Sequence, residues 1–478
     1  MMLGYNQNMK FIFKYWVWLI AIISVILFLW LRFYSLRTAF DFTGDPGRDM
    51  LTLWDWRENG KPPLLGPQTS AMPLNQSAVY FYMLYPVFLL MNGNPISANI
   101  TVAIFWIVSL VAGLVILRKR PDLQWVCLIV FALSSIQPIF VSQTRAVWNP
   151  SFLPPLITAV FISILLLEEK FSLARMFVFT VSLAWAVSLH FPIGTIAVAG
   201  LFYVLFFFKK NRFLIALSFI FCLYLFNLPT LIFEIRHDFL ISKSVLSGNW
   251  LGVAQYTRWE NIKLMIGFTG SLGLWWANLA MLFGLGIFGL TKIKSKNVSL
   301  TKIVGFVFFV SLLLTIASKM AFHSHYIFGF VIALFILISQ LPTKIFLPLF
   351  LVLEIIWLNP TQTNRYFTPA RRTFEEMSSC MSKICSSEKT PVFVSVQSAL
   401  NPFHVGYEYR YMMKQSGCQV KYIESQPDAA RTMVVILDDS SYEPGETGFN
   451  ELTLFGKSKV VSRYVCSKNF GAIVLQKI

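Results

Sequence analysis

The sequence predicts an α-helical polytopic membrane protein with a small C-terminal α/β domain outside the cytoplasm. Three observations predict this fold class. Of 478 residues, 56% are hydrophobic and only 13% are charged, too few to cover a soluble protein of this length. The apolar residues form long runs, and about 20 apolar residues in a helix cross the hydrocarbon core. After Asn359-Pro360 the charges rise and the apolar runs shorten.

Eleven runs are predicted to be membrane-spanning helices, because a helix satisfies its own backbone groups in lipid. They cover residues 15–32, 98–117, 124–141, 151–167, 173–190, 193–208, 213–231, 268–290, 303–318, 326–340 and 345–358. The first run lacks the small-residue cleavage site of a signal peptide and is expected to be retained. The short aromatic run 78–91 is broken by Pro86 and is expected to lie along the interface.

The basic residues predict the orientation. With a cytoplasmic N-terminus and a non-spanning 78–91, the basic clusters all fall on the cytoplasmic side, as the positive-inside rule requires. These clusters are 118–120, Lys170 with Arg175, 209–212, 292–302 and Lys344. The predicted domains are then a membrane domain, 1–360, and an extracytoplasmic domain, 361–478, in a multi-pass protein of the plasma or inner membrane. The loop charges also account for the net charge of +17, so no nucleic-acid partner is predicted.

The C-terminal domain is expected to be mixed α/β. A helix is predicted over 371–385, and strands over 391–396 and 433–437. The domain also holds four cysteines, and disulfides are permitted outside the cytoplasm. Four cysteines allow three pairings, among which the sequence does not choose. They are Cys380, Cys385, Cys418 and Cys466.

An acidic motif follows the first predicted span. Asp41, Asp45 and Asp49 are spaced by four residues around Pro46, which suits the first turn of a helix. Asp45 is expected at the N-cap of that helix. Two interpretations stay open at this point: Asp45 only caps the helix and Arg48 pairs with a neighbouring Asp, or the carboxylate takes part in catalysis.

Further polar residues gather at the predicted outer ends of the spans. Such residues are functional candidates where they converge on a cavity. The alternatives are arginines that snorkel to headgroups, aromatic residues of the membrane belt and histidines that satisfy local hydrogen bonds. The candidates for binding a donor phosphate are Arg145, Arg236, His237, Lys319, His323 and His325.

Carboxylates that face Arg, Lys and His suit a reaction whose donor leaves as a phosphate. A carboxylate can take the proton of an acceptor hydroxyl. Fixed cations then stabilise the charge on the departing phosphate. His323 and His325 are two residues apart, a spacing that rarely shares one ligand site on a helix. No cofactor is predicted, and a divalent metal is left open.

The membrane region, roughly 10–360, resembles the C-type (GT-C) membrane glycosyltransferases of family 39, which include protein O-mannosyltransferases and aminoarabinose transferases. The residues that carry the resemblance are the motif 45–49, the segment 59–67, the aromatic run 80–84, the segment 145–150 and His325-Tyr326. The resemblance implies a polyprenyl-phosphate sugar as donor and a lipid, glycan or protein acceptor outside the cytoplasm. It also implies that Asp45 is the catalytic residue, as a general base or by binding the acceptor, with Arg48 and Asp49 in the acceptor or active-site loop.

The chain departs from the family pattern at two positions. Pro46 stands where the family often has Glu, and Gln76 where many members have Lys or His. The prediction for phosphate contact therefore shifts to Arg145, Arg236 and Lys319. Two other functions stay open, a surface-polysaccharide ligase and a transporter or lipid flippase. The outer placement of the polar residues and the lack of an internal repeat favour the transferase over the transporter.

Overall fold

A computed structural model describes most of the chain in two compact units. The described residues are 7–40, 42–69, 74–208, 210–247, 257–260, 262–263, 299–317, 324–358, 360–398, 405–438, 450–467 and 470–478. The first unit comprises residues 1–33, 63–84 and 99–364, and the second 34–62, 85–98 and 365–478. The second unit thus includes two segments of the predicted membrane domain together with the predicted C-terminal domain.

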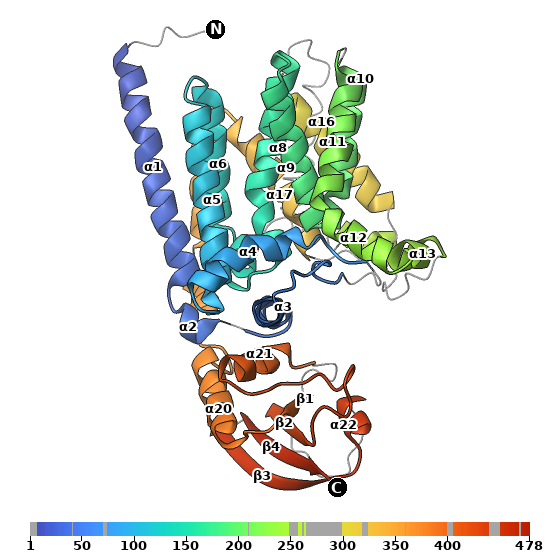
Figure 1. The fold of residues 1–478 in the computed structure, drawn as a ribbon. Helices are drawn as coiled ribbons and strands as arrows, with labels where there is room; N and C mark the ends of the chain where they lie inside the picture. Colours follow the sequence, from blue (N-terminus) through green and yellow to red (C-terminus); the bar gives the residue numbers. More distant parts are fainter. Residues whose placement is uncertain are drawn as a thin grey trace. The chain divides into compact units, whose positions relative to one another are not determined.

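The first unit is a bundle of apolar helices (Figure 1). In chain order it contains α1 (Gln7–Phe33), most of α5 (Ile96–Ile116), α6 (Pro121–Ile136), α7 (Pro138–Arg145), η1 (Asn149–Phe152), α8 (Leu153–Glu169), α9 (Leu173–Leu189), η2 (Phe191–Ile193), α10 (Gly194–Phe207), α11 (Arg212–Phe226), α12 (Leu228–Arg236), α13 (Leu240–Leu246), α16 (Leu300–Ala317), η3 (Ser324–Ile327), α17 (Phe328–Ser339) and α18 (Thr343–Trp357).

Apart from α13, which lies between two predicted spans, the described α-helices of the bundle overlap the predicted spans, which confirms a polytopic helical membrane protein. Among the described residues, four helices are long and apolar enough to cross a membrane, or up to six if each of two bent pairs is one span. The predicted range 268–290 lies outside the described residues. The count of eleven spans and the orientation stay predictions. The α4 helix (Val79–Leu90) covers the run predicted to be interfacial; its 12 residues are shorter than a span needs.

Two predicted spans are bent rather than straight. The range 124–141 is divided into α6 and α7, which meet at 71°, and 213–231 is divided into α11 and α12, which meet at 62°. Each second helix has a proline in its first turn. Proline has no backbone N–H and clashes with the preceding turn, so the helix cannot continue straight through it.

One ion pair shows that two predicted cytoplasmic turns lie at the same end of the bundle. Arg120, in the turn after α5, binds Glu169 at the end of α8 at 2.7 Å. The turns from α5 to α6 and from α8 to α9 are at one end in Figure 1. The basic clusters 118–120 and 170–175 therefore share one side, as the positive-inside rule predicts.

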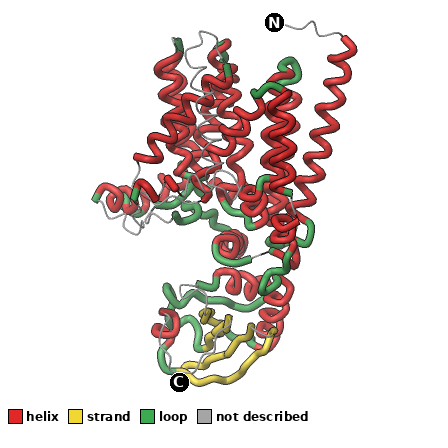
Figure 2. Tube along the Cα trace, turned by 180° about the vertical axis from the view of Figure 1, so that it is seen from behind, coloured by secondary structure: helices red, strands yellow, loops and turns green. Residues whose placement is uncertain are grey.

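The second unit is built on a four-stranded sheet with the order β1-β2-β4-β3 (Figure 2). The strands are β1 (Val392–Ser398), β2 (Thr432–Asp438), β3 (Ser458–Ser467) and β4 (Phe470–Lys477). β1 and β2 are parallel, and the other two pairs are antiparallel. The predicted strands 391–396 and 433–437 correspond to β1 and β2. The alternating burial along β3 is that of an edge strand with one exposed face.

Helices cover the sheet of the second unit. They include α20 (Phe374–Ser387), α21 (Tyr407–Gln415) and α22 (Asn450–Phe455). From the N-terminal segment, α2 (Leu36–Ala39) packs on α20, and α3 (Asp45–Asn59) packs on α21. Leu452 and Phe455 of α22 pack with Phe393, Met433 and Val435 in one core. α20 confirms the predicted helix 371–385. It begins with a capping box of Thr373 and Glu376.

Two disulfides fasten α20 within the second unit. Cys380 pairs with Cys466 on β3, and Cys385 pairs with Cys418 just after α21. The structure thus selects one of the three pairings that the sequence allowed. Cys127 and Cys222 are free.

Thiol alkylation of the unfolded protein checks this pairing. We expect two alkylated cysteines without reductant, since only Cys127 and Cys222 are free, and six after reduction. Peptide mapping should find the two pairs above. Alkylation of four or more cysteines without reductant would contradict the assignment.

Candidate functional site

The acidic motif forms the first turn of α3. The helix begins at Asp45, and Gly44 is its N-cap. The expectation that Asp45 is the N-cap is therefore wrong by one residue. Gly44 has a φ of 61°, a left-handed conformation that glycine adopts without strain. The Asp45 carboxylate instead turns toward Arg48, one helical turn further along.

Arg48 holds both carboxylates of the motif. Its Nη1 lies 2.5 Å from Asp45 Oδ1, and its Nη2 lies 2.7 Å from Asp49 Oδ1. The Arg48 Nε also donates to Asp49 Oδ1 at 2.9 Å. Asp49 is therefore a buried anchor that fixes the guanidinium, and the guanidinium orients Asp45.

The two carboxylates differ in their access to solvent. The Asp45 side chain is 46% exposed, whereas the Asp49 side chain is 1% exposed. A group that takes a proton from an acceptor must be within hydrogen-bond reach of that acceptor. Of this pair, Asp45 alone is open to such contact, which agrees with the role that the family resemblance implies.

Arg145, a predicted phosphate ligand, is buried in the first unit. Its Nη1 donates to the carbonyl oxygens of Leu31 at 3.0 Å and Arg32 at 3.2 Å, at the C-terminal end of α1. A cation at a helix C-terminus stabilises the last carbonyls and the helix dipole. The structure thus provides Arg145 with a structural partner, and its contact with phosphate stays a prediction.

Arg32 is a buried cation that sequence reasoning missed. It donates from Nε to Thr144 Oγ1 at 3.0 Å and from Nη2 to Ser134 O at 3.2 Å, and its guanidinium lies 4.2 Å from the centre of the Phe28 ring. Its position at the end of the first apolar run was the available signal. With Arg145 it joins α1 to α6 and α7.

Four polar and aromatic residues from separate loops meet around the end of α9; we call Gln76, Asn149, His190 and Tyr326 the loop-end cluster. Gln76 Oε1 accepts from the backbone N–H of Phe191 at 3.2 Å. The Asn149 side chain donates to the carbonyl of Leu189. The rings of His190 and Tyr326 are 5.6 Å apart. The structure therefore brings Gln76 and two segments that carry the family resemblance, 145–150 and His325-Tyr326, close to His190.

The predicted phosphate ligands Arg236 and His237 are not in this cluster. Arg236 and His237 are exposed at the end of α12, where the His237 ring stacks on Phe233. Lys319 and His323 lie outside the described residues, and of His325 only the backbone, in η3, is described. Within the described parts of the chain, no group of three or more metal-ligating side chains is present.

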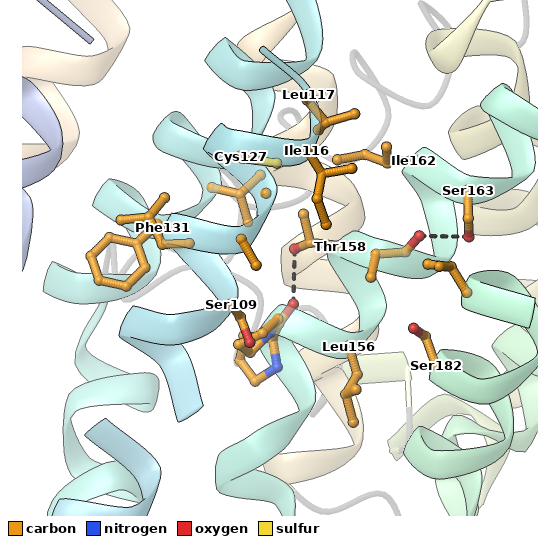
Figure 3. A pocket seen from close by; sticks show the side chains of 18 of the residues that line it. Ser109, Ile116, Leu117, Cys127, Phe131, Leu156, Thr158, Ile162, Ser163 and Ser182 are labelled. Atoms are coloured by element: carbon orange, nitrogen blue, oxygen red, sulfur yellow. Dashed lines mark hydrogen bonds between the residues drawn. The ribbon is translucent and has the colours of Figure 1, made fainter. Parts of the chain in front are cut away.

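A cavity of about 600 Å³ lies between α5, α6, α8 and α9 of the first unit (Figure 3). Hydroxyl groups in its wall bind carbonyls of their own helices: Ser109 to Phe105, Thr158 to Pro154 and Ser163 to Ala159, at 2.6 to 2.8 Å. These hydroxyls are satisfied internally. Most other lining side chains are apolar, so the cavity suits an apolar chain rather than a polar ligand.

Replacing Arg145 by Gln separates its two roles. We expect the thermal unfolding midpoint of the solubilised protein to fall by several degrees, because two hydrogen bonds from a buried charge, worth about 3–6 kcal/mol together, are lost. The exposed Arg236→Gln variant is the control and should keep the wild-type midpoint. An unchanged midpoint for Arg145→Gln with weaker donor binding would instead favour the predicted contact with phosphate.

Solved membrane glycosyltransferases have a similar fold. ArnT from Cupriavidus metallidurans bound to undecaprenyl phosphate aligns with a TM-score of 0.60 at 12% identity, over 97% of this chain and 98% of ArnT. Its apo structure aligns with a TM-score of 0.62 at 11% identity and the same coverage. The Archaeoglobus fulgidus oligosaccharyltransferase in complex with Zn and sulfate aligns with a TM-score of 0.53 at 12% identity, over 87% of this chain and 67% of that one.

The sequence matches no family model and no curated protein. At these identities the structural similarity shows the fold. The chain has the GT-C fold of these membrane glycosyltransferases, which confirms the predicted fold class and the resemblance.

Proposed function

We propose that the protein transfers a sugar from a polyprenyl-phosphate donor to an acceptor hydroxyl on the extracytoplasmic face of the cell membrane. The observation that carries the proposal is the similarity along almost the whole chain to ArnT, in a structure that holds undecaprenyl phosphate. Within the second unit the exposed Asp45 carboxylate is a candidate base, and within the first unit the apolar cavity has room for an apolar chain.

Asp45 is the proposed general base. Its carboxylate accepts the proton of the acceptor hydroxyl as the oxygen attacks the anomeric carbon of the sugar. The bond between that carbon and the phosphate oxygen breaks, and the polyprenyl phosphate leaves with the electron pair. Arg48, fixed by the buried Asp49, holds Asp45 in one orientation through the contact at Oδ1. Cations near the leaving phosphate would stabilise its charge.

The cavity between α5, α6, α8 and α9 is the proposed site for part of the isoprenoid chain. Its volume of about 600 Å³ exceeds what a single side chain would fill. Small residues such as Ala112, Gly113 and Ala159 widen it. Each buried methylene contributes about 0.8 kcal/mol, so such a cavity would bind a long apolar chain firmly.

Asp45→Asn tests the base. We expect kcat to fall by about 10² to 10⁴-fold, the usual contribution of a general base, with donor KM little changed. The assay follows label released from undecaprenyl phosphate that carries mannose, glucose or aminoarabinose, with the protein in membranes. Asp428→Asn, at a side chain that is 95% exposed, is the matched control and should keep wild-type activity. Turnover within tenfold of wild type in Asp45→Asn would exclude this base.

Ala112→Phe tests the chain site. The larger ring should occupy the cavity and raise KM for an undecaprenyl donor by about tenfold, a loss of about 1.4 kcal/mol. A short-chain donor, which does not reach the cavity, should keep its KM. Val108→Phe is the matched control, since Val108 is 59% exposed on the same helix and does not line the cavity. Equal effects of Ala112→Phe on both donors would argue against this site.

A further inference from the structure

We infer that Lys414 is a positioning residue that sets the orientation of α3 and thereby of the Asp45 carboxylate. Lys414 lies in residues 365–478 of the second unit, which we call the C-terminal unit. The inference rests on the function proposed above. It assigns part of the active site to a lysine more than 350 residues further along the chain, in a segment that the sequence marks only as a soluble domain.

α3 and α21 pack at unusually short distance near the acidic motif. A Cβ atom placed on Gly47 would lie 2.8 Å from the backbone N and the Cβ of Glu408 on α21, closer than real Cβ atoms approach such atoms. Only glycine therefore allows this contact between α3 and α21. The contact fixes the N-terminal turn of α3, two residues from Asp45.

Aromatic rings continue the contact along α3. The Tyr411 ring of α21 packs edge-on against Phe42 and Trp54, with ring centres 5.6 and 5.9 Å apart. The Tyr411 hydroxyl donates to the carbonyl of Gly93. Apolar packing of this kind keeps two helices in contact but resists rotation about the helix axis less well than directional bonds do.

Lys414 supplies the directional bonds. Its Nζ lies 2.6 Å from Asp55 Oδ1 and 2.7 Å from Glu58 Oε2, and its side chain is only 7% exposed. The Tyr422 hydroxyl donates to the second oxygen of Asp55 at 2.7 Å. The C-terminal half of α3 is thus held from two sides by groups of the C-terminal unit.

One cation faces two carboxylates in this contact. Burial alone would lower the pKa of the Lys414 ammonium, but the hydrogen bonds to Asp55 and Glu58 outweigh burial and raise that pKa. The lysine is therefore charged at neutral pH. Because two carboxylates on successive turns share one buried cation, its removal leaves them facing each other without compensation.

These attachments define the rotation of α3. The helix is attached at two points, Gly47 and Asp55, which are about 12 Å apart along its axis at 1.5 Å rise per residue. Together the two attachments fix the direction of the helix axis and the rotation of the helix about that axis. A shift of about 1 Å at a reacting group can reduce turnover by about 10²-fold. The disulfide Cys385–Cys418 supports the arrangement, since it ties the chain just beyond Lys414 to α20.

The test uses the full chain in membranes and two readouts. One is turnover of the radiolabelled undecaprenyl-phosphate sugars, and the other is hydrogen exchange of the α3 amides. For Lys414→Met we expect kcat to fall by about 10 to 100-fold, with donor KM within about twofold of wild type and faster exchange in α3. Lys414→Arg keeps a cation that can bind both carboxylates and should restore most of kcat.

Further variants separate positioning from folding. Asp55→Asn with Glu58→Gln should reproduce the kcat loss from the α3 side. The exchanged pair Asp55→Lys with Lys414→Asp should recover activity at least tenfold above either single variant. Lys457→Met, at an exposed lysine of the same unit, is the control. Retention of both disulfides shows that each variant is folded.

The outcomes distinguish this inference from the proposed function. Wild-type kcat in Lys414→Met with unchanged α3 exchange overturns the inference and leaves the function intact. Equal loss in Lys414→Met and Lys414→Arg with unchanged α3 exchange also overturns it. If the wild type releases no label from any donor, the proposed function fails, while faster α3 exchange in Lys414→Met alone would still support the attachment.

Discussion

The packing of α3 against α21 is the contact on which the candidate catalytic residues depend. Gly47 permits the close approach to Glu408, and Lys414 binds both Asp55 and Glu58. A helix of 15 residues with few buried apolar side chains has little stability of its own in water. The Asp45 motif therefore owes its defined orientation to the C-terminal unit. The proposed active site is in this sense shared between the two ends of the sequence.

Buried cations organise both units, but with different partners. In the first unit Arg32 and Arg145 bind carbonyl oxygens at helix ends, among them those at the C-terminus of α1. In the second unit Lys414 and Arg410 bind carboxylates, and Arg410 lies 2.7 Å from Glu424. Burial would raise the pKa of the Glu424 carboxyl, but its bond to Arg410 prevails and lowers that pKa. Helix ends leave several carbonyls without partners, which explains why buried arginines that donate to carbonyls are useful inside the bundle.

Several features could be predicted from local patterns. The runs of apolar residues located the described helices of the bundle, and the short β-type runs located β1 and β2. The bends at Pro138 and near Pro229 were missed, because an apolar pattern does not report where a chain turns inside the membrane.

Asp45, Arg48 and Asp49 were identified as one motif, and the structure shows them in contact. Arg32 and Lys414 were missed, since a lone cation at the end of a run or in a soluble domain carries no local signal.

The sequence by itself determined the class of protein, because hydrophobic run length and charge placement are set by the bilayer and need no knowledge of tertiary contacts. It also determined the acidic motif, since residues within one helical turn meet whatever the rest of the chain does. Only the tertiary structure decided the disulfide pairing, the partners of Arg145 and the attachment of α3 to α21. Each of these joins residues distant in the chain, as Lys414 and Asp55 are, and depends on which helix faces pack together.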